Sequence, residues 1–102
     1  MKFLVFFDLP VETNDEKREY RLFRKKLLEE GFIMIQYSVY MRTCPNREFA
    51  KKFLPKLKIM IPSRGNIRTL MITEKQYQDM DFIVGSKKKQ EIIVGINKVV
   101  II

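Results

Sequence analysis

The stretch Phe3-Leu-Val-Phe-Phe-Asp8-Leu-Pro10 opens this 102-residue chain and decides how the rest must be arranged around it. Phenylalanine and valine favour strands, and no polar residue interrupts the run with a helical period, so residues 2–9 are predicted to form a β-strand. Both alternating faces of this strand are apolar. A strand of this kind must be covered on both sides, so we expect helices on one face and another subunit on the other.

Length, charge and cysteine content limit the class of protein. At 102 residues the chain fits one domain, and its 20 lysines and arginines against 12 acidic residues give a net charge of +8. Such a charge favours a polyanionic partner, although a merely solvated basic surface is the alternative. Cys44 is the single cysteine and histidine is absent, which excludes an internal disulfide and a zinc site. The first apolar run ends at Asp8, too short for a membrane span, so we expect a cytoplasmic protein without a membrane partner.

A helix is predicted over residues 14–30. Thr13 and Glu16 form a capping box at its start, and Gly31 suits the left-handed position after its last turn. Tyr20, Phe23 and Leu27 recur at helical spacing and predict its buried face. The basic residues beside that face form a stripe, which is either a solvated surface or a contact for a polyanion: Lys17, Arg21, Arg24 and Lys25.

Residues 32–42 alternate with a period of two and are predicted to form a strand, with a strand that bends into two as the alternative. Its predicted inner face is Ile33, Ile35, Tyr37, Val39 and Met41. Its predicted polar, contact-making face is Gln36, Ser38, Tyr40 and Arg42.

The second half of the chain predicts a further helix and strand. Asn46 is the expected N-cap of the helix, and Pro55 predicts a kink or break in it. A turn at Gly65 precedes a strand over residues 67–73, and a short polar segment follows. The apolar pieces of residues 82–102 are too short to form a layer alone, so they are expected to extend a sheet, that of a partner subunit.

This order of elements predicts an α+β fold, a ferredoxin-like βαββαβ sandwich formed by one domain over residues 1–102. Asp8 is its candidate catalytic residue and metal ligand. Mg²⁺ binds through one or two carboxylates with several waters, and a two-fold homodimer would bring two copies of Asp8 together. Two charges about 4 Å apart repel by roughly 4 kcal/mol at an effective dielectric near 20, and a divalent cation would relieve that repulsion. Ser38 and Tyr40 are candidate neighbours in the site, and a capping role for Asp8 in the Pro10 turn is the alternative.

Four segments, in this order along the chain, carry a resemblance to a known family. Together they are similar to the second CRISPR-associated protein family, the small adaptation subunit in its type II-like form. The segments are Val5-Phe-Phe-Asp-Leu-Pro10, Tyr20-Arg-x-Phe-Arg-Lys25, Gly31-Phe-Ile-Met-Ile-Gln-Tyr-Ser-Val-Tyr40 and Pro62-x-x-Gly-Asn-Ile-Arg68-x-Leu-x-Ile-Thr73-x-Lys-Gln76.

The resemblance implies a ferredoxin-like homodimer whose C-terminal strand pairs with the partner subunit. It implies a place between two dimers of the CRISPR integrase, where the protein helps to hold a double-stranded spacer DNA. It also implies metal-dependent cleavage of RNA or DNA by Asp8, with Mg²⁺ or another divalent cation. A free-standing toxin-like endoribonuclease and a non-catalytic RNA-binding module are the alternatives. The candidate phosphate contacts are Arg18, Arg21, Arg24, Lys25, Arg42, Arg64 and Arg68.

Overall fold

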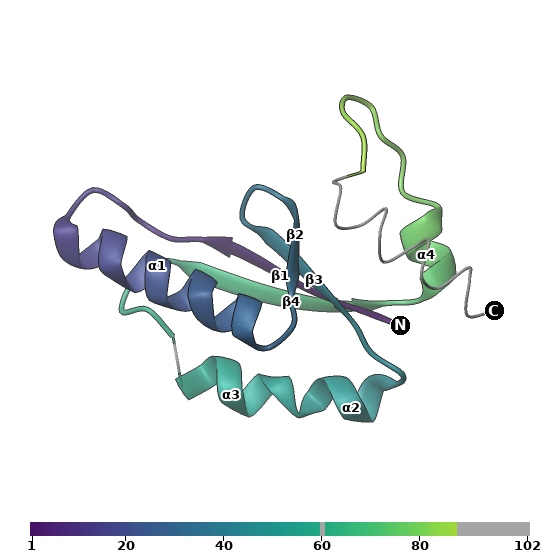
Figure 1. Ribbon diagram of the computed structural model, residues 1–102, viewed down its shortest axis with the longest axis horizontal. Helices are drawn as coiled ribbons and strands as arrows, with labels where there is room; N and C mark the ends of the chain where they lie inside the picture. The colour runs from purple at the N-terminus through teal and green to yellow at the C-terminus, as the bar shows by residue number, and fades with distance from the viewer. Residues whose placement is uncertain (60, 88–102) are drawn as a thin grey trace.

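The computed structural model describes residues 1–59 and 61–87 of the chain (Figure 1). Within these residues, four strands form one antiparallel sheet in the order β2-β3-β1-β4. This order, with helices after β1 and β3, confirms the predicted ferredoxin-like α+β fold. The elements are β1 (Lys2–Asp8), α1 (Asn14–Glu29), β2 (Ile33–Gln36), β3 (Val39–Thr43), α2 (Arg47–Lys51), α3 (Phe53–Ile59), β4 (Asn66–Ile72) and α4 (Glu74–Gln78).

Strand β1 is central, as its composition predicts. It pairs with β3 on one edge and with β4 on the other, so that Phe6 lies opposite both Val39 and Arg68. The pairing with β4 continues to the last residue of β1, where Asp8 lies opposite Asn66. The end of the central strand is therefore fixed in position by its neighbour.

Helices α1, α2 and α3 cover one face of the sheet (Figure 1). The alternate β1 residues Phe3, Val5 and Phe7 are buried against these helices. The Phe7 ring meets Phe23 of α1 edge-on, with 5.2 Å between the ring centroids. The capping box predicted at the start of α1 is present, since the Glu16 amide donates to Thr13 Oγ1 at 3.1 Å. The capping box and the alternation of apolar residues in the sequence are therefore consistent with the packing of the helices on this face.

The second face of the sheet, to which Leu4, Phe6 and Asp8 of β1 belong, is partly covered within the same chain. Leu4 is only 1% exposed and packs with Met41 and Ile72. Tyr77 of α4 lies against this cluster. The expectation that a partner subunit supplies the whole cover was therefore wrong for this part of the face, because α4 turns back onto the sheet.

Helix α4 stands where the sequence analysis predicts a short polar segment and assigns no helix. Thr73 and Gln76 form a capping box, and the Thr73 amide donates to Gln76 Oε1 at 2.8 Å. Contacts at the start of β1 attach α4 to the sheet, since the Met1 amino group lies 3.2 Å from Glu74 Oε1. The capping pattern was the signal that the sequence interpretation missed.

Residues 32–42 form two strands, β2 and β3, joined by a turn at Tyr37 and Ser38, so the alternative of a bent strand is the correct one. Ser38 has a φ of 62°, which breaks the strand. Of the predicted polar face, Tyr40 and Arg42 lie under the helices, whereas Ser38 lies in the turn and Gln36 is exposed. Tyr40 is 1% exposed within the core and does not face solvent.

The second helical segment begins as predicted and breaks earlier than expected. Asn46 caps α2, its side-chain oxygen accepting from the Phe49 amide at 2.8 Å. The break between α2 and α3 falls at Lys52, and Pro55 lies in the first turn of α3. Proline is tolerated there because the first amides of a helix have no partner within it.

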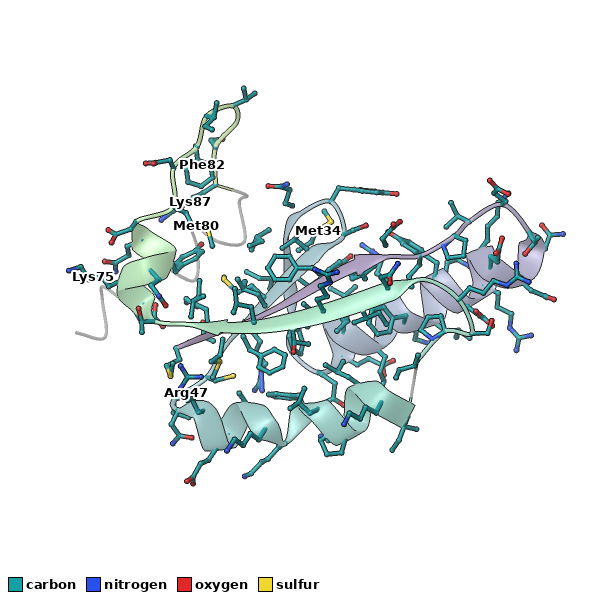
Figure 2. The ribbon with its side chains drawn as sticks, turned by 180° about the vertical axis from the view of Figure 1, so that it is seen from behind. Met34, Arg47, Lys75, Met80, Phe82 and Lys87 are labelled. Atoms are coloured by element: carbon teal, nitrogen blue, oxygen red, sulfur yellow. The ribbon has the colours of Figure 1, made fainter. Side chains whose placement is uncertain are left out.

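The segment after α4 leaves the sheet. Figure 2 shows Met80 and Phe82 on this segment, on the opposite side of the sheet from Arg47 and α2. Residues 82–87 form an exposed bend and are not a strand of this sheet. The predicted pairing of residues 82–102 with a partner subunit falls mostly on residues 88–102, which lie outside the described residues.

Gly65 fixes the approach of β4 to the end of β1. Its φ is +107°, and a Cβ atom there would lie 2.5 Å from the Asp8 carbonyl oxygen. We expect Gly65→Ala to lower the free energy of unfolding by about 2 kcal/mol more than Gly85→Ala. Gly85 is the matched control, since its φ is +95° but nothing lies within 4 Å of the same added atom.

Urea unfolding followed by circular dichroism measures both variants. Equal losses of unfolding free energy in the two variants would show that the positive φ alone explains the effect at Gly65. The close approach of the added Cβ atom to Asp8 would then contribute nothing.

Candidate functional site

Asp8 is exposed at the end of β1 and lines a depression of about 370 Å³ at that end of the sheet. The side chains around it come from the ends of β1 and β4 and from the turn between β2 and β3. The residues lining the depression are Phe6, Phe7, Asp8, Tyr37, Ser38, Val39, Asn66 and Arg68.

The sheet register brings a cation and an amide to the same depression as Asp8. Asn66 lies opposite Asp8, and Arg68 follows two residues later on β4, opposite Phe6. Because alternate residues of a strand share a face, Asp8, Asn66 and Arg68 lie on the second face of the sheet. The depression therefore combines one carboxylate, one guanidinium and one side-chain amide.

The turn between β2 and β3 closes the other side of the depression. The Phe7 amide donates to the Ser38 carbonyl oxygen at 3.1 Å, so the turn is attached to β1 directly beside Asp8. Ser38 is thus brought to Asp8, as the sequence interpretation predicts. Tyr37 of the same turn also lines the depression, whereas the sequence interpretation assigned it to the apolar inner face.

Tyr40, the other predicted neighbour of Asp8, is not a residue of the depression. Its ring stacks on Phe7 within the helix-covered core, with 5.5 Å between centroids and 26° between ring planes. Its hydroxyl is buried without a hydrogen-bond partner among the described residues. The prediction was wrong because the alternation of a strand does not reveal which face the helices cover.

Tyr20 of α1 links the core to the turn. Burial raises the pKa of the Tyr20 hydroxyl above its ordinary value, and a hydrogen bond with Tyr37 raises it further. The Tyr20 ring packs edge-on against Phe7, at 6.0 Å between centroids. Tyr20 therefore connects α1, β1 and the turn beside Asp8.

The predicted basic residues occupy several surfaces. Arg68 lines the depression, and Arg64 lies in the exposed loop before β4. Arg42 is on the helix-covered face, contrary to the predicted polar face, with its guanidinium 4.6 Å from the centroid of the Phe53 ring. The remaining candidates are exposed on α1: Arg18, Arg21, Arg24 and Lys25.

The oxygen ligands at the depression suit a hard divalent cation. Asp8 provides a carboxylate, and Ser38 and Asn66 provide neutral oxygens, whereas Zn²⁺ prefers nitrogen or sulfur ligands. In residues 1–59 and 61–87, no group of three or more acidic or cysteine side chains is placed to hold a metal ion. The residues therefore fit Mg²⁺ bound through one carboxylate with water completing its shell.

The chain belongs to the family described as CRISPR associated protein Cas2, whose sequence profile matches residues 1–80. It is similar to the CRISPR-associated endoribonuclease Cas2 of Ligilactobacillus salivarius, with 51% identity over 88% of this chain and 89% of that protein. The protein of the same name from Lacticaseibacillus rhamnosus is 46% identical over 87% of this chain and 88% of its own length. These relatives confirm the family that the four sequence segments indicate.

A solved structure supports the fold. The Cas2 crystal structure from Streptococcus pyogenes superposes with a TM-score of 0.64 and 21% identity, over 83% of this chain and 100% of that chain. As for membrane association, the helices of the described part of the chain are all too short or too polar to cross a bilayer.

Proposed function

We propose that this protein is a metal-dependent endonuclease that hydrolyses phosphodiester bonds in RNA at the Asp8 depression. The observation that carries the proposal is the placement of Asp8 and Arg68 in one exposed depression by the pairing of β1 with β4. The name of its relatives, CRISPR-associated endoribonuclease Cas2, supports RNA as the substrate.

Each side chain has a separate task in this reaction. The Arg68 guanidinium binds a non-bridging oxygen of the scissile phosphate and offsets its negative charge. The Asp8 carboxylate would hold a divalent cation, and Ser38 and Asn66 would offer further oxygen ligands. When bound, the cation supplies a water of lowered pKa and stabilises charge on the phosphoryl oxygens.

Hydrolysis needs no histidine in this arrangement. The oxygen of a water molecule would form a bond to phosphorus and release one proton to solvent, while the bond from phosphorus to the leaving ribose oxygen breaks. The leaving oxygen would take its proton from solvent, to which the depression is open. Because histidine is absent from the chain, the proton transfer is expected to limit the rate.

The active form in this proposal is a two-fold homodimer. Asp8 is exposed on the second face of the sheet, and only part of that face is covered by α4. Pairing two such faces would bring a second Asp8 to the cation and supply the two carboxylates that Mg²⁺ commonly uses. The dimer would also bury apolar side chains, such as Leu70, that are exposed in the single chain.

Substitution of Asp8 tests the reaction directly. We expect Asp8→Asn to reduce Mg²⁺-dependent cleavage of single-stranded RNA by at least roughly 100-fold, because the neutral amide cannot supply the anionic ligand. Asp81→Asn is the matched control, since Asp81 is an exposed acid on the segment after α4. Cleavage is measured on gels, and the melting temperature of each variant is measured alongside.

The assignment of Asp8 fails if Asp8→Asn cleaves at the rate of the unaltered protein. It also fails if Asp81→Asn loses as much activity, because the loss would then follow net charge and not the position of the carboxylate.

We propose a second role in CRISPR adaptation, in which the dimer binds double-stranded spacer DNA between dimers of the integrase. A separate observation favours this role: α1 presents exposed cations over successive turns, away from the Asp8 depression. These cations are Arg18, Arg21, Arg24 and Lys25. Phosphates are spaced regularly along a duplex, so such a row can bind DNA of any sequence.

Salt dependence tests the duplex role. If about six phosphate contacts form, log K should fall with log salt at a slope near −5, and Arg21→Ala or Arg24→Ala should reduce that slope by about one. Lys26→Ala is the control on the same helix, because Lys26 already lies 3.9 Å from Glu30 in an ion pair. Two duplexes of unrelated sequence are titrated by fluorescence anisotropy. A slope near zero, or a strong preference for one of the two duplexes, would rule this role out.

A further inference from the structure

A second depression, of about 320 Å³, lies on the helix-covered face of the protein, where the end of α1 meets α2 and α3 (Figure 1). We call it the Arg42 depression, after the β3 residue in its wall. Arg42 lies opposite Phe3 near the start of β1, whereas Asp8 is the last residue of that strand. The Arg42 depression is therefore at the other end of the central strand, and it shares no lining residue with the Asp8 depression.

The Arg42 guanidinium packs against two aromatic rings and against the chain that follows α1. Its Cζ atom lies 4.6 Å from the centroid of the Phe53 ring and 5.1 Å from that of the Phe49 ring. A Cβ atom at Gly31 would lie 3.0 Å from Arg42 Nε, so glycine at this position leaves room for the guanidinium. Arg42 is half-buried, and within residues 1–59 and 61–87 its guanidinium forms neither an ion pair nor a hydrogen bond.

These ring contacts leave the N–H groups of Arg42 without an oxygen acceptor. The face of an aromatic ring attracts the positive charge, but the five N–H donors of a guanidinium point outward in its own plane. A half-buried charged donor without an acceptor costs free energy, because part of its water has been removed. A carboxylate presents two oxygens in one plane, which match two of these donors.

The charges around the Arg42 depression favour a single carboxylate over a polyanion. The lining cations Arg42, Lys52 and Lys56 face only two carboxylates, Glu29 and Glu30, so the surplus is one positive charge. Glu30 is already paired, since Lys56 Nζ lies 3.2 Å from its carboxylate. A DNA duplex carries one negative charge per about 1.7 Å of its axis, so its further phosphates would be repelled by the two glutamates. One carboxylate matches the surplus without that repulsion.

We propose that the Arg42 depression is a docking site for a protein partner and that the Arg42 guanidinium binds one aspartate or glutamate side chain of that partner. The half-buried ring of Phe49 provides a surface for an apolar residue beside that acid. Lys52 is exposed, with its Nζ 5.3 Å from the centroid of the same ring, and adds a second positive charge. The inference goes beyond the proposed nuclease function and does not depend on it, because the two depressions are separate.

The test titrates the full-length protein with two capped tripeptides, acetyl-Leu-Asp-Leu-amide and acetyl-Leu-Asn-Leu-amide. Binding is followed by nuclear magnetic resonance of the Arg42 Nε–H group. We expect the aspartate peptide to shift this signal and to bind roughly 10- to 150-fold more tightly than the asparagine peptide, because only the first offers a charged acceptor. A short DNA duplex should leave the Arg42 signal unchanged.

Three variants assign the binding to the depression, with backbone amide signals as the readout. Arg42→Gln should weaken binding of the aspartate peptide by at least roughly 10-fold. Lys52→Ala alters an exposed side chain and leaves the core intact, and it should weaken binding by about 2- to 5-fold. Lys51→Ala is the matched control, since Lys51 is an exposed cation of α2 outside the depression and its loss should change binding by less than about 2-fold.

Equal affinities for the two peptides, or no shift of the Arg42 signal by either, would overturn the inference. The same holds if Lys51→Ala weakens binding as much as Lys52→Ala, because the effect would then follow net charge alone. A shift of the Arg42 signal by the duplex, reversed by the aspartate peptide, would also overturn it, since the ligand of the depression would then be a nucleic-acid phosphate.

Discussion

The pairing of β1 on both of its edges is the constraint on which the rest of the structure depends. Strand β3 pairs with one edge and β4 with the other, so every residue from Phe3 to Phe6 has a partner residue in both neighbouring strands. Alternate side chains of β1 then fill the core under the helices or lie on the second face. Asp8 is the last residue of this strand, where the pairing with β3 has ended but the pairing with β4 continues. A carboxylate is therefore exposed and yet rigidly placed.

This arrangement separates structural from chemical side chains. Phe7 belongs to the core, where it contacts Tyr20, Phe23 and Tyr40, while its amide holds the turn that carries Ser38. The next residue along the chain, Asp8, points to the other face because successive strand residues alternate. A buried core ring and the candidate metal ligand are thus adjacent in sequence. Substitutions that disturb the packing of Phe7 would therefore shift the position of Asp8, although the core side chains do not contact the ligand.

Much of this fold could be predicted from the sequence because its signals are local. The apolar run before Asp8 predicts a central strand, and Thr13 with Glu16 predicts the start of α1, where the structure confirms a complete capping box. The site was harder to predict. Periodicity separates Tyr40 from Met41 but cannot say which of the two faces the helices cover, so Tyr40 was assigned to the site although it is buried in the core. Tyr37 was not predicted as a residue of the site. Its position depends on the left-handed conformation of Ser38, which no residue type in the turn indicates.

We propose that the end of β1 holds a divalent cation through Asp8. Paramagnetic broadening of backbone amide signals by Mn²⁺, followed by nuclear magnetic resonance at substoichiometric metal, tests it without relying on cleavage. We expect the signals of Asp8, Ser38 and Asn66 to broaden first and this selective broadening to be lost in Asp8→Asn. Broadening centred on other acids, such as those at the start of α1, or the same broadening in Asp8→Asn, would show that Asp8 is not the metal ligand.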